Sequence, residues 1–349
     1  MQKSELDELL AFAFEKDASD IHLSAGNAPV LRIHGKLRHL ESPVLTDTGL
    51  RALFHDILTD KQKRALEIDL ELDFAYAIRG VARFRTNLFF QLRGEAASFR
   101  AIPDQVRSLK ELKAPQGIYA LCQKKEGIVL VTGPTGSGKS TTLAAMIDAI
   151  NTERHEHILT IEDPVEYVHQ SKNCLVNQRE LGENTHSFSA ALRSALREDP
   201  DIILVGEMRD LETIDLALTA AETGHLVFAT LHTMSAAETV NRIVDVFPPE
   251  QQHQIRTMFA TTIEGVVAQR LLPTKDGNGR VAAHEILIAT VAVRNMIREK
   301  KTHQLHSAIQ TGSSYGMQTM DSALKGFLNE GLISKDEAFA NATDTSHFT

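Results

Sequence analysis

The stretch GIVLVTGPTGSGKSTT, residues 127–142, decides the fold of this chain of 349 residues. An apolar run leads into a glycine-rich turn, and residues 133–140 match the pattern G-x-x-x-x-G-K-[ST] in full. A strand before such a turn and a helix after it let backbone N–H groups converge on phosphate oxygens. Lys139 is expected to reach the outer phosphates and Ser140 to ligate Mg²⁺. We therefore predict a phosphate-binding loop (P-loop) for a nucleoside triphosphate, formed by Gly133, Pro134, Thr135, Gly136, Ser137, Gly138, Lys139, Ser140 and Thr141.

Strands and helices alternate from Gly117 onward, a pattern typical of an α/β fold with a doubly wound parallel sheet. The predicted strands are 127–132, 157–162, 202–206 and 225–231, and the predicted helices are 139–150, 187–198, 211–222 and 236–246. Beyond Pro249 the pattern is mostly helical, interrupted by a hairpin at 276–280 and a strand at 281–288.

Residues 1–104 are predicted to form a separate α+β domain, with 105–116 as a linker and 117–349 as the P-loop domain. Its predicted elements are a helix over 5–16, an extended segment at 19–23, a hairpin about His34-Gly35, helices over 46–59 and 61–66, and a three-stranded meander over 72–103. Side chains alternate along a strand, so Arg83 and Arg85 share one face of the meander and Phe84 lies on the other. Taken alone, these arginines are also consistent with ordinary solvated positions.

An isolated carboxylate follows the apolar run of DIILVGEMRD, residues 201–210. A carboxylate at the end of a buried strand is costly unless a cation or hydrogen-bond donor faces it. Ligands of parallel sheets bind at the carboxyl ends of the strands. Glu207 is therefore expected to face Mg²⁺ or a water bound to it, which makes Ser140 and Glu207 the candidate metal ligands. Asp210 is expected to cap the following helix, and Arg209 has no predicted role.

Three carboxylates follow the strand in HILTIEDPVEYV, residues 157–168. Hydrolysis needs one residue that orients or deprotonates the attacking water, and Glu166 is our candidate. Glu162 and Asp163 are candidates for organising Mg²⁺-bound waters or the turn itself. The alternative for Glu166 is a solvated loop position.

Two histidines flank the predicted strand 225–231, in GHLVFATLHTMS. His232 lies at the carboxyl end, where it is expected to hydrogen-bond an outer phosphate oxygen, with a purely structural role as the alternative. His225 lies at the opposite end, so contact with nucleotide is not expected for it.

Composition lowers the expectation of nucleic-acid binding, since the net charge is −9 and there is no Trp. The two cysteines, Cys122 and Cys174, lack metal-ligand spacing and fit a reducing compartment. No apolar run approaches the ~20 residues of a membrane span, and we identify no signal peptide.

Four blocks together, the P-loop, IEDPVE, GEMRD and TLHT, resemble the secretion ATPases of the type II secretion, type IV pilus and VirB11 group. The resemblance implies ATP as substrate and a homohexamer of PAS-like N-terminal domains joined to RecA-like P-loop domains with a helical C-terminal region. It implies Glu207 as the acidic residue that serves Mg²⁺, Glu166 as the base, and His232 as the phosphate contact. It also implies that Arg85 and Arg100 reach nucleotide phosphates.

Within this group, the chain is similar to the ATPases that retract type IV pili. The segment TVAVRNMIREKK, residues 290–301, and the C-terminal sequence carry this closer resemblance. It implies a cytoplasmic location at the inner-membrane base of the pilus, an integral platform protein (PilC-like) as partner, and possible cooperation with a second, PilU-like ATPase. The helix expected over 290–301 is our candidate for coupling nucleotide state to movement, with ordinary packing as the alternative.

Alternatives remain open. A pilus-extension or type II secretion ATPase usually has an extra N-terminal domain and a four-cysteine zinc loop, and AQRLLPTKDGNGR (268–280) has no cysteine. A PilU-like accessory ATPase, a nucleic-acid motor and a nucleotide-binding scaffold without activity are the others.

Overall fold

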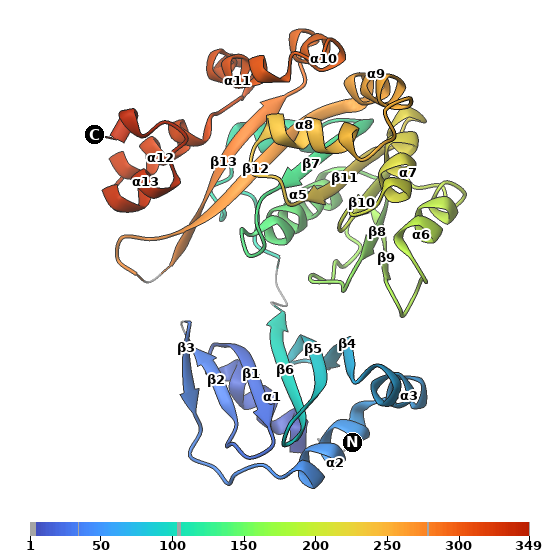
Figure 1. Ribbon diagram of the computed structural model, residues 1–349, viewed down its shortest axis with the longest axis vertical. Coiled ribbons are helices and arrows are strands. Elements are labelled where there is room, and N and C mark those ends of the chain that lie inside the picture. Colours follow the sequence, from blue (N-terminus) through green and yellow to red (C-terminus); the bar gives the residue numbers. More distant parts are fainter. Residues whose placement is uncertain (1–4, 34, 103–105, 278, 349) are drawn as a thin grey trace. The chain divides into compact units, whose positions relative to one another are not determined.

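The chain forms two compact units in the computed structural model, which describes residues 5–33, 35–102, 106–277 and 279–348 (Figure 1). The first unit contains Met1–Gln105 and Glu166–Val168, and the second contains Val106–Val165 and His169–Thr349. His34 of the predicted hairpin in the first domain, residues 103–105 at the predicted boundary between this domain and the linker, and Asn278 of the hairpin predicted at 276–280 lie outside the described residues.

An antiparallel sheet of six strands, in the order β3-β2-β1-β6-β5-β4, forms the first unit together with three helices. Its strands are β1 (Ala18–Ser24), β2 (Val30–Ile33), β3 (Lys36–His39), β4 (Glu71–Ile78), β5 (Ala82–Gln91) and β6 (Gly94–Ile102), and its helices are α1 (Glu5–Glu15), α2 (Asp47–Ile57) and α3 (Asp60–Asp69). The predicted meander is therefore confirmed. Phe84 and Phe99 are buried in the core of this unit, whereas Arg85 and Arg100 are exposed on the opposite face of the sheet.

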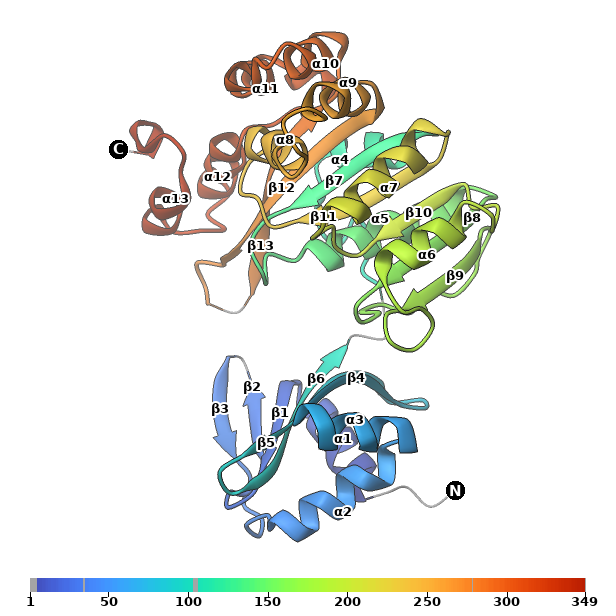
Figure 2. The ribbon, with the colours of Figure 1, turned by 45° about the vertical axis from the view of Figure 1, so that its right-hand side comes forward.

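A sheet of seven strands forms the second unit, in the order β13-β12-β7-β11-β10-β8-β9, with helices on both faces (Figure 2). All neighbouring strands pair in parallel except β12 and β13. The strands are β7 (Gly127–Thr132), β8 (His157–Glu162), β9 (Leu175–Glu180), β10 (Ile202–Val205), β11 (Leu226–Leu231), β12 (Ile263–Pro273) and β13 (Arg280–Ile288). Of the five predicted strands, four form β7, β8, β10 and β11, and the strand predicted at 281–288 is β13 at one end of the sheet, so the predicted doubly wound arrangement is confirmed.

Two strands of this sheet were not expected from the sequence. The prediction of a mostly helical chain beyond Pro249 is wrong at β12, an 11-residue strand that pairs with β7. Both faces of β12 are largely buried, so its apolar residues do not alternate with polar ones. The edge strand β9, with sequence LVNQRE, has the opposite composition and lacks an apolar run.

Most helices of the second unit start with a residue whose side chain caps the helix N-terminus. Asp210 accepts a hydrogen bond from the Thr213 N–H at 2.9 Å, which confirms the predicted cap. The helices are α4 (Gln116–Cys122), α5 (Lys139–Glu153), α6 (Phe188–Ala195), α7 (Leu211–Glu222), α8 (Ala236–Asp245), α9 (Gln252–Thr262), α10 (Val291–Arg298), α11 (Leu305–Thr311), α12 (Met320–Asn329) and α13 (Lys335–Asn341). Among the described residues, none of the helices is long and apolar enough to cross a membrane.

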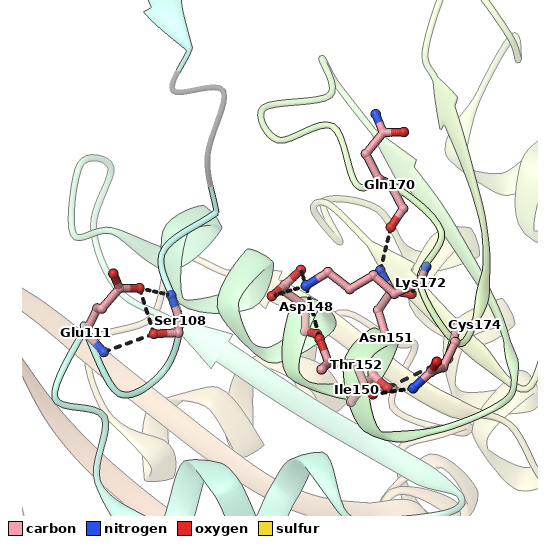
Figure 3. Close-up of polar contacts among 10 residues, drawn as sticks. Ser108, Glu111, Asp148, Ile150, Asn151, Thr152, Gln170, Lys172 and Cys174 are labelled. Carbon is pink, nitrogen blue, oxygen red and sulfur yellow. Dashed lines mark hydrogen bonds and ion pairs between the residues drawn. The ribbon is translucent and has the colours of Figure 1, made fainter.

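The segment that leads into β9 is fastened to α5, the helix that follows the P-loop (Figure 3). The Lys172 ammonium contacts the Asp148 carboxylate at 2.7 Å, and the Asn151 side chain donates to the Gln170 carbonyl at 2.8 Å. Asn151 is almost fully buried. One helix therefore anchors both the P-loop at its start and the approach to β9 near its end.

We predict that Phe99→Ala lowers the free energy of unfolding of the first unit by about 3–5 kcal/mol, because it empties a fully buried aromatic site. The ring of Phe99 lies 6.4 Å from that of Phe54, measured between centroids. Urea denaturation followed by circular dichroism measures the change. Phe12→Ala is the matched control, since Phe12 is 42% exposed and its loss should cost about 1 kcal/mol or less. Equal effects of the two substitutions would contradict this description of the core.

Candidate functional site

Parallel pairing places the predicted groups of the second unit at one edge of the sheet. The P-loop follows β7, His232 follows β11, Glu207 lies just beyond β10, and Glu162 ends β8. These strands are consecutive neighbours in the order β7-β11-β10-β8. Adjacent strands lie about 4.8 Å apart, so one end of the sheet brings together a phosphate-binding turn, a histidine and two carboxylates.

The P-loop is a tight turn between β7 and the start of α5. Gly133 and Gly138 have φ of +142° and +87°, values that other residues rarely adopt. The apex, residues 134–136, is exposed, and the Lys139 ammonium folds back to donate to the Gly133 carbonyl at 2.8 Å. A glycine-rich turn at a helix N-terminus with a lysine beside it fits a phosphate chain. The buried Ser137 hydroxyl has no hydrogen-bond partner among the described residues.

Glu207 is held by an arginine and a histidine. One carboxylate oxygen lies 2.7 Å from Arg209 Nε and 2.9 Å from His232 Nε2, and the other accepts from Arg209 at 2.7 Å. Burial acts to raise the pKa of Glu207, but the hydrogen bond and charge of Arg209 and the contact with His232 outweigh it, so the pKa is lowered. The carboxylate therefore stays ionised, as a ligand for a divalent cation must be.

His232 is a direct neighbour of Glu207 at the end of β11. The loop around Glu207 is also bound to β11, since the Thr230 hydroxyl donates to the Gly206 carbonyl and the Met208 N–H donates to the Thr230 carbonyl at 3.2 Å. The same strand therefore places both the histidine and the carboxylate loop.

The acidic turn after β8 is shaped by residues of the neighbouring strands. Glu162 accepts hydrogen bonds from the Thr160 hydroxyl at 2.7 Å and from the Gln178 amide at 3.2 Å. The buried Glu180 carboxylate of β9 accepts from the Val165 N–H at 3.0 Å, one residue before Glu166. Glu166 itself is half-buried, and its carboxylate has no hydrogen-bond partner in the part of the chain that the structure describes.

Arg85 and Arg100 lie directly opposite each other on β5 and β6. Paired residues of antiparallel strands project on the same face, so the two arginines form one basic pair on the first unit. Arg100 Nε donates to the Asp20 carboxylate at 2.8 Å, and Arg32 lies 3.5 Å from the same group. Burial acts to raise the pKa of Asp20, but the hydrogen bonds from Arg100 and Ser19 outweigh it and lower the pKa.

His225 lies away from the phosphate edge, at the amino end of β11. Its ring nitrogen Nδ1 lies 2.9 Å from the Ala220 carbonyl oxygen of α7 and 3.2 Å from the Thr223 hydroxyl. These contacts connect the end of α7 to the start of β11, which is a structural role.

Arg294 of α10 bonds to neighbouring elements. Its guanidinium pairs with Glu264 and also donates to the Thr261 carbonyl, in the last turn of α9. Glu264 in turn lies 2.7 Å from the Lys124 ammonium. Arg294 therefore packs α10 against the junction of α9 and β12, while Val293 and Ile297 are fully buried.

Two residues of this edge were missed in the sequence. Arg209 could have been found from its position two residues after Glu207, since a long side chain can fold back to a carboxylate at that spacing. Glu180 gave no signal, because it lies in a polar edge strand whose pairing partner is not apparent from its sequence.

The chain matches the family model described as type II/IV secretion system protein over residues 2–339. It is 56% identical over 344 residues to the type IV pilus retraction ATPase PilT of Pseudomonas aeruginosa, covering 99% of this chain and 100% of the relative. The type IV pilus ATPase PilU of the same organism is 38% identical over 338 residues, covering 97% of this chain and 88% of the relative.

A crystal structure of the pilus retraction motor PilT with bound ADP aligns with a TM-score of 0.91 at 48% identity, covering 97% of each chain. This match confirms the predicted fold class, in which an N-terminal domain precedes a RecA-like ATPase domain.

We predict that Arg209→Gln lowers the free energy of unfolding at neutral pH by about 1 kcal/mol or less, since the Arg209 side chain is 74% exposed and screened by solvent. The pKa of Glu207 is lowered in the folded state, so its stabilisation is complete above the unfolded pKa of about 4.3. It is lost as the pH falls through the lowered pKa. The difference between wild type and variant should therefore disappear in acid, as measured by denaturation across pH. A difference that is constant across this range would contradict the assigned pair.

Proposed function

Because the chain belongs to the type II/IV secretion system protein family, we propose that it is an ATP-hydrolysing motor that powers type IV pilus retraction and hence twitching motility. The observation that carries this proposal is the 56% identity to a pilus retraction ATPase, which extends over nearly all of both chains. The complete P-loop supports the reaction, ATP and water to ADP and phosphate.

Different residues of the site bind the phosphates and Mg²⁺. Gly133 to Thr141 bind the phosphates through backbone N–H groups, and Lys139 exchanges its contact with the Gly133 carbonyl for a phosphate oxygen. Ser140 and Glu207 serve Mg²⁺, which neutralises phosphate charge when bound. The oxygen ligands fit this hard cation, and Glu207 is kept ionised by its neighbours.

Glu166 orients and deprotonates the attacking water. Its half-buried carboxylate lies in a turn fixed by Glu180, which supports this role. His232 contacts the terminal phosphate from the end of β11. Arg85 and Arg100 compensate phosphate charge, and their opposed positions on β5 and β6 supply two guanidinium groups at one place.

The motor acts as a homohexamer in the cytoplasm, at the inner-membrane base of the pilus. Residues 1–104 form the PAS-like domain, 105–116 the linker and 117–349 the RecA-like domain. Nucleotide binding favours one arrangement of the domains over another, so that hydrolysis drives rigid-body movement. The integral platform protein (PilC-like) receives this movement, and a PilU-like ATPase is a candidate second partner.

A pilus-extension or type II secretion ATPase is less well supported. The segment between β12 and β13 contains no cysteine, and it therefore lacks the four-cysteine zinc loop that is usual in pilus-extension and type II secretion ATPases. A role as PilU-like accessory is the remaining alternative within the pilus machinery. The lower identity to PilU, 38% against 56% to PilT, favours the retraction motor itself.

We predict that Glu166→Gln reduces ATP turnover by about 10²–10⁴-fold, because an amide cannot accept the proton of the attacking water. Binding of ADP should be unchanged. Phosphate release and equilibrium nucleotide binding measure the two quantities. Glu222→Gln, at an exposed position of α7, is the matched control and should retain full turnover. Normal turnover by Glu166→Gln would show that another group handles the water.

We predict that the wild-type gene restores twitching to a retraction-deficient strain and that Glu207→Ala does not, since it removes a metal ligand. Equal rescue by both would exclude Glu207 as an essential residue of the site. Deletion of the gene in its own host should give non-twitching cells with excess pili. Deletion mutants with normal pilus number and twitching would contradict the role as main retraction motor.

A further inference from the structure

We propose that Gln269 of β12 is a positioning residue for the P-loop, which sets the direction of a backbone N–H toward the phosphates. The inference rests on the proposed ATP-binding function. Gln269 lies far from the P-loop in sequence but next to it in space, because β12 pairs in parallel with β7 and Ala268 lies opposite Thr132.

The Gln269 amide joins the P-loop to the first turn of α5. Its Nε2 donates to the Ser137 carbonyl at 2.6 Å, and its Oε1 accepts from the Thr142 hydroxyl at 2.8 Å. Gln269, Ser137 and Thr142 are all buried, with exposed fractions of 2%, 3% and 4%. Buried polar groups that lose such partners are costly, so this bridge is held firmly in place.

The orientation of the amide follows from the chemistry of its partners. The Ser137 carbonyl can only accept a hydrogen bond, so the NH₂ group of Gln269 must face it. The amide oxygen then faces Thr142, whose hydroxyl is able to donate. Glutamine therefore satisfies both partners at once, whereas leucine would satisfy neither and ionised glutamate would repel the carbonyl.

Peptide geometry connects this bridge to phosphate binding. The peptide group between Ser137 and Gly138 is planar, and in the trans form its C=O and N–H point in opposite directions. Holding the Ser137 carbonyl against Gln269 therefore turns the Gly138 N–H away from β12. In a P-loop, N–H groups at this point of the turn cradle the phosphates.

Close packing of Gln269 against the P-loop also explains why two positions of the motif are glycine. A Cβ atom at Gly133 would lie 2.3 Å from the Gln269 carbonyl oxygen, and one at Gly138 would lie 2.9 Å from Gln269 Nε2. The first contact would collide with backbone, and the second would displace the amide that holds the Ser137 carbonyl. The main chain and the side chain of Gln269 thus both define the surface on which the P-loop rests.

The test measures ADP binding and steady-state ATPase kinetics for Gln269→Leu, Thr142→Val and Thr142→Ser. We expect Gln269→Leu to weaken ADP binding about tenfold or more, the loss typical of one unsatisfied buried polar group. Thr142→Val should weaken it by about half an order of magnitude, and Thr142→Ser, which keeps the hydroxyl, should bind like wild type. In the double variant Gln269→Leu, Thr142→Val, the two effects should be less than multiplicative.

Two further measurements separate positioning from general loss of fold. Thr86→Val removes a buried hydroxyl that has no hydrogen-bond partner among the described residues, and it should leave ADP binding unchanged. In Gln269→Glu, the introduced side chain can still donate a hydrogen bond to the Ser137 carbonyl while it is protonated. Once it loses its proton, it can no longer donate. Its ADP affinity relative to wild type should therefore fall as the pH rises.

Wild-type ADP affinity in a folded Gln269→Leu variant would overturn the inference. If that variant does not fold, unchanged ADP binding by Thr142→Val, or a pH-independent affinity ratio for Gln269→Glu, would overturn it instead. Failure of the wild-type protein to bind ADP or hydrolyse ATP would be a different result, which contradicts the proposed function rather than the role of Gln269.

Discussion

The parallel pairing of β12, β7, β11, β10 and β8 is the constraint on which the second unit depends. It brings the carboxyl ends of five strands to one edge, although they come from parts of the chain far apart in sequence. Side chains along a strand alternate between the two faces of the sheet, so a shift of one residue in the pairing register would turn the side chains of that strand to the wrong face. The buried apolar residues of β7, β10 and β11 oppose such a shift, because both of their faces lie in the core.

Three carboxylates at this edge, Glu207, Glu162 and Glu180, each have a local partner. Arg209 and His232 contact Glu207, Thr160 and Gln178 bind Glu162, and Glu180 accepts from the backbone of the acidic turn. The partners reduce the repulsion between neighbouring negative charges. They also fix the geometry of the edge before any nucleotide binds, which is what an electrostatically preorganised site requires.

The central strands and the P-loop could be predicted from the sequence because each is encoded locally, by an apolar run, a glycine pattern or a cap such as Asp210. The strand order could not, since nothing in IEGVVAQRLLP indicates that it pairs with β7. Gln269 was missed for this reason: it lies 132 residues from Ser137, and only the pairing of β12 brings them together. Arg209 was missed because its partner depends on a side-chain conformation.

The basic pair of the first unit has a consequence for how this unit responds to ionic strength. Arg85 and Arg100 lie opposite each other on neighbouring strands, with Arg32 nearby, and among the described residues Asp20 is the one carboxylate that bonds to this row. Like charges at directly opposed positions destabilise a sheet, and dissolved salt weakens their repulsion. Salt usually weakens surface ion pairs, but here it relieves an excess of positive charge. Multivalent anions, which interact with several guanidinium groups at once, should therefore stabilise the folded unit more than chloride does.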